Sequence, residues 1–148
     1  MKNMTLKGRG ITGGIAEGEA LVTGEAFSFA HGLDPVTGEL TDAEIRDWVG
    51  QNAKGKVLVF PYGKGSSLGG LYICQAANRG NAPAAVINVK TDPVIAVGFL
   101  LCGILYQQRI PVVDSLEKNP IEAIRTGDRI RVDADRGTVE IIEPTTPG

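Results

Sequence analysis

A chain of 148 residues is long enough to bury one hydrophobic core without disulfide bonds or structural metal ions, and we expect a single domain over residues 1–148. Hydrophobic residues make up 43% and charged residues 22%, as in ordinary soluble proteins, and the net charge of -2 gives no basic surface for nucleic acid or an anionic membrane. Two cysteines and one histidine are too few for a metal site with the usual ligand set, so we expect no metal bound by this chain.

The start of the chain, MKNMTLKGRG, has no apolar signal core. The longest apolar run, residues 94–106, contains Gly98 and Gly103 and is shorter than the roughly 20 residues that a membrane span needs. We therefore expect a cytoplasmic protein in which Cys74 and Cys102 are buried free thiols.

Short strands or a hairpin are expected over residues 6–25, where glycines alternate with β-favouring residues. Residues 26–39 carry turn signals, including Asp34-Pro35, and predict an ordered surface loop. Residues 41–48 predict a short helix, with Thr41 as its cap and Glu44 reaching back in a capping box.

The next part of the chain repeats a strand and a helix. Apolar runs of the kind found in strands buried on both faces are followed by segments with helical spacing and by helix-stopping glycines. The predicted elements are a strand at 56–62, a helix ending at Gly80, a strand at 84–89, a helix from the cap Asp92 and Pro93 to Cys102 with Gly103 as terminator, and a strand at 110–114. This order predicts a parallel βαβαβ core.

The last part predicts one helical turn at Asn119-Pro120 and a β-hairpin formed by residues 129–133 and 138–142. Residues 143–148 are expected to form a flexible tail. The fold class is therefore α/β, with antiparallel strands added to a parallel core.

A glycine-rich turn, residues 63–70 (GKGSSLGG), joins the first strand of the repeat to its helix. Free amides at a helix start attract anions, and Lys64 adds a cation. The turn lacks the third glycine of the dinucleotide fingerprint, because Leu68 stands there, and it lacks the Lys-Ser or Lys-Thr of a Walker loop. It therefore predicts a site for a small anionic substrate that is not recognised through either fingerprint.

Ser66 is the candidate catalytic residue of this turn. A serine hydroxyl among amide donors can be stabilised as an alkoxide and accept a proton. The same hydroxyl, or that of Ser67, can equally well cap the helix, and the residues of the turn leave both possibilities open.

The segments VLVFPYGKGSSLGG, GRGITGGIAEGEALVTGEAFSF, GLDPVTGEL and INVKTDPVIAVGFLLCGI together resemble the small subunit, or swivel domain, of the aconitase X family. The resemblance implies a swivelling β/β/α domain that closes on a large catalytic subunit carrying an iron-sulfur cluster, the pair forming a hydro-lyase. It also implies that Ser66 is the proton acceptor. From their place in the glycine turn, Lys64, Gly65, Ser67 and Gly69 are the candidate substrate-binding residues around it. No cofactor is expected on this chain itself.

The family's activities include phosphomevalonate dehydration, which gives an anhydromevalonate phosphate, and cis-3-hydroxy-L-proline dehydration. Lys64 and Ser66-Ser67 are closer to the phosphomevalonate type. Ala30-His31-Gly32, however, stands where many relatives have Trp-Gly-Gly after Ser-Phe, so the substrate stays open between the two.

Other polar residues are weaker candidates. Asn88 is expected at the carboxyl edge of the sheet, where open α/β folds bind ligands, and Arg9 is a candidate clamp for a carboxylate or phosphate. Asp92 is expected to cap a helix or, with Asn88, to face the ligand at this edge. Asp34 is expected to form a turn or to line the cleft, and His31 to lie exposed in a loop or to contact the substrate.

Two further functions have to be distinguished from a dehydratase subunit. The closing segment GDRIRVDADRGTVEI resembles that of phosphohistidine swivel domains, but such a carrier needs a histidine on the glycine turn, where this chain has Ser66-Ser67. A stand-alone anion-binding module would bind a metabolite tightly without a partner subunit.

Overall fold

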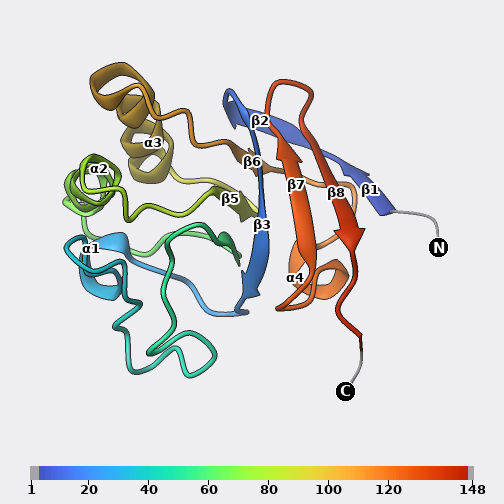
Figure 1. Ribbon diagram of the computed structural model, residues 1–148, viewed down its shortest axis with the longest axis horizontal. Coiled ribbons are helices and arrows are strands. Elements are labelled where there is room, and N and C mark those ends of the chain that lie inside the picture. Colours follow the sequence, from blue (N-terminus) through green and yellow to red (C-terminus); the bar gives the residue numbers. More distant parts are fainter. Residues whose placement is uncertain (1–3, 147–148) are drawn as a thin grey trace.

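The computed structural model describes residues 4–146, which form an eight-stranded sheet and four helices (Figure 1). The strands are β1 (Met4–Lys7), β2 (Arg9–Thr12), β3 (Ile15–Val22), β4 (Val57–Phe60), β5 (Ala85–Asn88), β6 (Val112–Asp114), β7 (Arg129–Asp133) and β8 (Thr138–Glu143). The helices are α1 (Phe29–Gly32), α2 (Gly69–Asn78), α3 (Pro93–Tyr106) and α4 (Pro120–Ala123). The predicted α/β class is confirmed.

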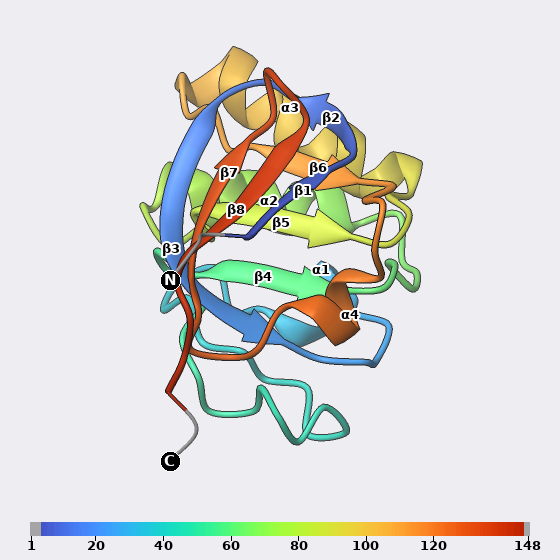
Figure 2. The same cartoon turned by 90° about the vertical axis from the view of Figure 1, so that its right-hand side faces the viewer.

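The strand order is β1-β8-β7-β3-β4-β5-β6-β2. Strands β3 to β6 run parallel to one another, and the remaining neighbours are antiparallel. Strands β1 and β2 end the order on opposite sides although only Gly8 separates them, so the sheet folds over on itself into two layers (Figure 2). Strand β3 belongs to both layers, because its first five residues pair with β7 and its last three pair with β4.

Two hydrophobic cores hold the three layers of the β/β/α arrangement together. Buried aliphatic side chains from β4, β5, β7 and β8, among them Val59, Ile87 and Ile130, fill the space between the two sheet layers. The second core lies between the parallel strands and helices α2 and α3 (Figure 1). Strands β4 and β5 are buried at every position, as their apolar runs predict.

The α2 and α3 segments follow the predicted strand-helix repeat. Asp92 caps α3 by accepting a hydrogen bond from the Ile95 amide at 2.9 Å, and Pro93 is the first helical residue. Cys74 and Cys102 are free and buried, and burial raises the pKa of the Cys102 thiol to about 12.

The predicted helix at 41–48 is wrong, because this segment forms a series of turns. The Thr41 hydroxyl donates to the His31 carbonyl, and Asp42 instead accepts the Glu44 amide at 3.0 Å, so the capping box does not form. Trp48 is drawn into the core, where its ring packs edge-on against Phe27 with 5.0 Å between ring centroids.

Three other expectations need correction. The 26–39 segment is more than a surface loop, since it contains α1 and buries Phe27, Phe29 and Leu33. Helix α3 runs through Gly103 and ends where Gln107 adopts a left-handed conformation with φ 57°. The tail predicted for 143–148 starts too early, because the Thr145 amide donates to Asp128 at 2.7 Å; residues 147–148 lie outside the described residues.

Candidate functional site

A small pocket lies where three neighbouring parallel strands end. The segments that follow β3, β4 and β5 line it with Phe27, Ser28, Phe29, Gly63, Lys64, Gly65, Ser66, Gly69, Asp92, Val94 and Ile95. Its volume is about 40 Å³, enough for a few water molecules. This is the edge of an open α/β sheet at which ligands commonly bind.

Ser66 is half-buried in the wall of this pocket, just before α2 begins. Its Oγ accepts a hydrogen bond from the Leu68 amide at 3.1 Å, and its carbonyl accepts the Gly69 amide at 3.0 Å. The hydroxyl thus closes the turn that leads into the helix. Because an amide donor stabilises a negative oxygen more than a neutral one, the same contact favours deprotonation of the hydroxyl. Neither serine caps α2, because the N-cap residue is Leu68 and no side chain makes a cap bond there, and the proton-acceptor role of Ser66 stays a prediction.

The residues around Ser66 divide into two groups. Lys64, Gly65 and Gly69 line the pocket with it, whereas Ser67 is exposed beside it. The Lys64 ammonium lies 3.6 Å from the Asp42 carboxylate on the 41–48 segment. In the described part of the chain, Lys64 makes no hydrogen bond to the Ser66 hydroxyl. The lysine side chain remains about half exposed, so this pair holds it weakly.

Two predicted candidates, Asn88 and Arg9, do not line the pocket. Each of them forms hydrogen bonds elsewhere in the chain. Asn88 is fully buried and its amide donates to the Phe60 carbonyl at 3.0 Å. Arg9 forms two hydrogen bonds of 3.0 Å to the carboxylate of Asp114, which also accepts the Thr91 amide at 2.9 Å. Asp114 ends β6, so this ion pair lies along the same sheet edge.

Asp92 contributes a carboxylate to the pocket in addition to capping α3. One oxygen makes the cap bond, while the other lies against the backbone of Gly63 so closely that a methyl group at position 63 would overlap with it. Gly63 is therefore needed for the close approach of β4's loop to the α3 cap. The sequence predicts Asp92 as a cap, with a position facing the ligand as the alternative, and the structure shows that it both caps α3 and lines the pocket of Ser66.

Ser28 lines the pocket but was not among the predicted site residues, although it lies in a segment that carries the family resemblance. It precedes α1, is only 3% exposed, and its Oγ has no hydrogen-bond partner among the described residues. Phe27 and Phe29, on either side of it, are buried aromatic rings of the second core.

The family model of the aconitase X swivel domain matches residues 5–141. The chain belongs to the aconitase X swivel-domain family. It is 46% identical over 138 residues to the phosphomevalonate dehydratase small subunit of Methanocella arvoryzae, a match covering 93% of this chain and 99% of the relative. To the protein of that name from Methanosarcina acetivorans it is 42% identical over 144 residues, covering 97% and 95%.

The three-dimensional fold agrees with that assignment. The crystal structure of Thermococcus kodakaraensis aconitase X in its holo-form matches with a TM-score of 0.85 and 43% identity, covering 95% of this chain and 99% of that chain. The expected swivel-domain fold is thus confirmed, with Ser66 in the turn between β4 and α2.

Within residues 4–146 of this aconitase X swivel domain, no three histidine, cysteine or acidic side chains gather where they could hold a metal ion. His31 is exposed on α1 and does not stand at the start of α2, the place that a phosphohistidine carrier would require. None of the helices in the described part of the chain is both long and apolar enough to span a membrane.

Proposed function

We propose that this chain is the small subunit of a phosphomevalonate dehydratase and that Ser66 is its proton acceptor. The observation that carries the proposal is the position of the Ser66 hydroxyl, in a pocket at the carboxyl ends of parallel strands and bonded to a backbone amide. The names of relatives that match nearly the full chain support phosphomevalonate over cis-3-hydroxy-L-proline as the substrate.

Dehydration of a hydroxy acid removes a proton from the carbon next to the one that carries the hydroxyl group. The electron pair of that C–H bond forms the new double bond, and the C–OH bond breaks with its electrons on oxygen. The hydroxyl leaves as hydroxide, which becomes water when it takes up a proton from solvent. Ser66 takes the proton on Oγ. The Leu68 amide prepares it for this task, because it stabilises the oxygen in its charged form.

Two properties of the pocket support a second subunit. About 40 Å³ does not hold a phosphorylated hydroxy acid, so most of the substrate must lie beyond this chain's surface. Moreover, the nearby cations Lys64 and Arg9 each have an acidic partner, and Asp92 adds a negative charge, so this chain offers little charge to neutralise an anionic substrate. The large catalytic subunit would supply the remaining contacts.

An iron-sulfur cluster, which the described residues of this chain do not fit, is assigned in this proposal to the large subunit. When bound there, it would act as a Lewis acid toward the leaving hydroxyl group. The small subunit contributes the base and one wall of the site.

Helix α3 is proposed as part of the surface on which the large subunit docks. Its sequence, PVIAVGFLLCGILY, is apolar on all sides, which is typical of a helix that is covered all round. Exposed apolar side chains nevertheless lie on it, at Val97, Leu100, Ile104 and Leu105. Its first turn contributes Val94 to the pocket wall, so a subunit that closes over Ser66 comes next to this surface.

The test is the Ser66→Ala variant in complex with the large subunit. Loss of a general base lowers turnover typically 10² to 10⁴-fold, and we expect a fall in kcat of about this size with phosphomevalonate as substrate. The variant should still assemble with the large subunit, and gel filtration measures this.

Ser67→Ala is the matched control, because Ser67 is exposed beside the pocket and does not line it. It should retain most of the turnover. Full turnover by Ser66→Ala would exclude the proton-acceptor role, and turnover of cis-3-hydroxy-L-proline in place of phosphomevalonate would correct the substrate.

A further inference from the structure

Ser28 has a hydroxyl group that the fold does not use. The residue is 3% exposed, and its Oγ makes no hydrogen bond within the described residues. It occupies the N-cap position of α1, yet the side chain makes no cap bond, and only the Ser28 carbonyl accepts bonds, from the His31 and Gly32 amides at 3.3 and 2.8 Å. The local structure thus uses the backbone of Ser28 and not its hydroxyl group.

Burial of an unpaired hydroxyl costs free energy, so such a group needs an explanation outside the chain's own hydrogen bonds. The indole nitrogen of Trp48 is a second buried atom without a partner in the described part of the chain, but Trp48 does not line the pocket. Ser28 does line it, together with Ser66 and Asp92. The hydroxyl oxygen itself is covered in this conformation, so a molecule in the pocket becomes its partner once the unbonded side chain rotates toward the pocket.

We propose that Ser28 is a substrate-binding residue of the pocket, whose hydroxyl donates a hydrogen bond to an oxygen atom of the bound hydroxy acid. This inference rests on the proposed function, since it concerns the molecule that reacts at Ser66. The segments after β3 and β4 then each bring one serine to the substrate, Ser28 to hold it and Ser66 to remove its proton.

The surroundings of Ser28 suit such a role. Phe27 and Phe29 flank it in the chain and are packed edge-on against each other, with ring centroids 4.9 Å apart, so the backbone that carries Ser28 is held by the aromatic core. A hydrogen bond made by a buried hydroxyl discriminates strongly between a substrate that offers the acceptor oxygen and one that does not.

Ser28→Ala, prepared in the complex with the large subunit, separates ligand binding from a structural role. We expect the Tm of the unliganded complex to be unchanged or slightly raised, because no hydrogen bond of the fold is lost. We also expect kcat/KM for phosphomevalonate to fall about 10- to 100-fold, the usual range for loss of a bond to a charged acceptor, mainly through a higher KM. Ser28→Thr, which keeps the hydroxyl, should restore part of this loss.

Thr12→Val is the matched control, because the Thr12 hydroxyl is also buried but makes both of its bonds, donating to Ile110 at 2.7 Å and accepting from the Val112 amide at 3.0 Å. It should lower the Tm by several degrees and leave KM unchanged. The reverse result for Ser28→Ala, a lower Tm with unaltered kinetics, would overturn the proposal and point to a structural water on Ser28.

Ser66→Ala in the same series keeps the two proposals apart. If Ser66→Ala loses turnover while Ser28→Ala keeps the wild-type KM, only the role of Ser28 is wrong. If Ser66→Ala keeps full turnover, the proposed function fails, whereas the rise in Tm on adding phosphomevalonate still reports whether Ser28→Ala weakens binding. A wild-type complex that does not bind phosphomevalonate contradicts both proposals.

Discussion

Asp114 carries a carboxylate whose side chain is 0% exposed, and its charge depends on a few hydrogen bonds. Burial alone would raise the pKa of Asp114, but the bonds from the Arg9 guanidinium and the Thr91 amide outweigh burial and hold this pKa below its usual value. A pKa that is lower in the folded than in the unfolded state stabilises the fold above the unfolded pKa, and this stability is lost as the pH falls through the folded one.

We predict that Arg9→Met lowers the urea midpoint of unfolding at pH 7, because it leaves the buried carboxylate with fewer donors. Without the guanidinium, burial dominates and the pKa of Asp114 rises. The deficit relative to the wild type should therefore narrow as the pH falls toward 4, where the variant's carboxyl group takes up a proton. Urea unfolding at several pH values measures both effects.

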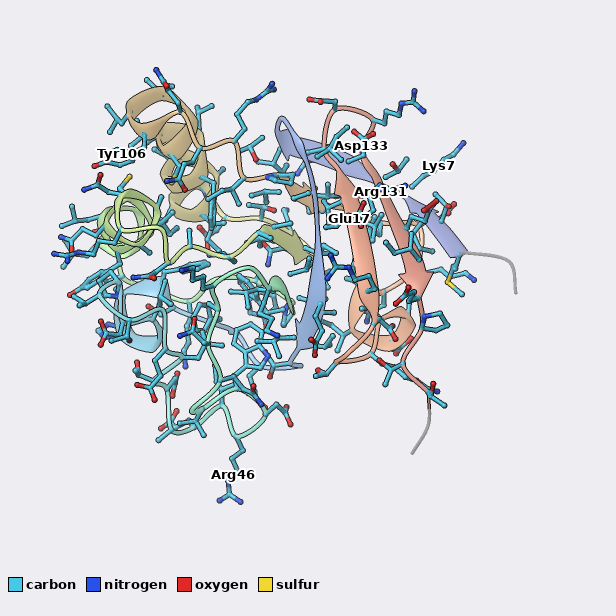
Figure 3. The ribbon with its side chains drawn as sticks, in the orientation of Figure 1. Lys7, Glu17, Arg46, Tyr106, Arg131 and Asp133 are labelled. Atoms are coloured by element: carbon cyan, nitrogen blue, oxygen red, sulfur yellow. The ribbon has the colours of Figure 1, made fainter. Side chains whose placement is uncertain are left out.

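Arg131→Met is the control for Arg9→Met. Figure 3 shows Arg131 and Glu17 side by side on the antiparallel layer, and their contact of 2.9 Å joins two side chains that are both partly exposed. Loss of a surface pair should change the urea midpoint little at any pH. If the two variants behave alike, Asp114 does not depend on Arg9 for its charge.

Ser66 shows how far residue types alone can define the site. The glycine turn, its place between strand and helix and the cap at Asp92 follow from local signals, and the structure has all of them. The place of Ser28 in the pocket does not follow from local signals, because only the neighbouring order of β3 and β4 brings its segment beside the glycine turn. A contact between segments that are distant in the chain leaves no mark on the local sequence pattern.

Helices α2 and α3 approach most closely at two glycines. A methyl group at Gly98 would lie 2.9 Å from Ile73 Cδ1 and 3.1 Å from the Cα of Gly70. Alanine favours a helix over glycine by up to about 1 kcal/mol, but overpacking typically costs about 1–3 kcal/mol. We predict that Gly98→Ala destabilises the chain by about 1–2 kcal/mol, measured by urea unfolding, because part of the overlap involves backbone that cannot move aside.

Gly103→Ala is the matched control in the same helix. The nearest atoms to a methyl group there are 3.9 and 4.0 Å away, so only the gain in helix propensity remains. It should stabilise the chain by up to about 1 kcal/mol. Equal effects of the two substitutions would contradict the view that the two glycines set the distance between α2 and α3.

The end of α3 illustrates why the predicted boundaries were less accurate than the elements themselves. Gly103 has the character of a helix terminator, but the helix continues because the space there is open and the apolar residues beyond it extend the same element. The 41–48 segment fails in the opposite direction: its capping signals are present, yet burial of Ile45 and Trp48 in the core favours turns. In the 41–48 segment, tertiary packing thus outweighs a local capping preference worth about 1 kcal/mol.

At the scale of the whole molecule, the individual strands could be predicted from the sequence, but the way in which the sheet folds over itself could not. The parallel strands and the closing hairpin were predictable, because period and turn chemistry identify them. The folding of the sheet over itself was not, since it depends on close contacts between backbones that are far apart in sequence. Gly10, for example, lies so close to the Ala134 carbonyl that a side chain could not fit.

The docking surface proposed on α3 lies at the outside of the molecule and can be tested by a single substitution. Figure 3 places Tyr106 at one end of this helix, on the outer side of the helical layer, and Ile104 nearby in the chain is 66% exposed. We predict that Ile104→Glu weakens binding of the large subunit at least 10-fold, because a buried interface does not accept an unpaired carboxylate. The Tm of the isolated chain should stay within a few degrees of the wild type, since the side chain contributes little to the core.

Val36→Glu is the control for Ile104→Glu, because Val36 is similarly exposed, at 58%, and lies on the 33–52 segment, which Figures 1 and 2 both show at the end of the molecule away from α3. Binding measured by calorimetry or co-purification should be unaffected by this substitution. If Ile104→Glu leaves binding intact and instead converts a dimer of this chain to a monomer, α3 pairs with a second copy. A loss of binding confined to Ile104→Glu would mean that the large subunit covers α3 when it closes over Ser66.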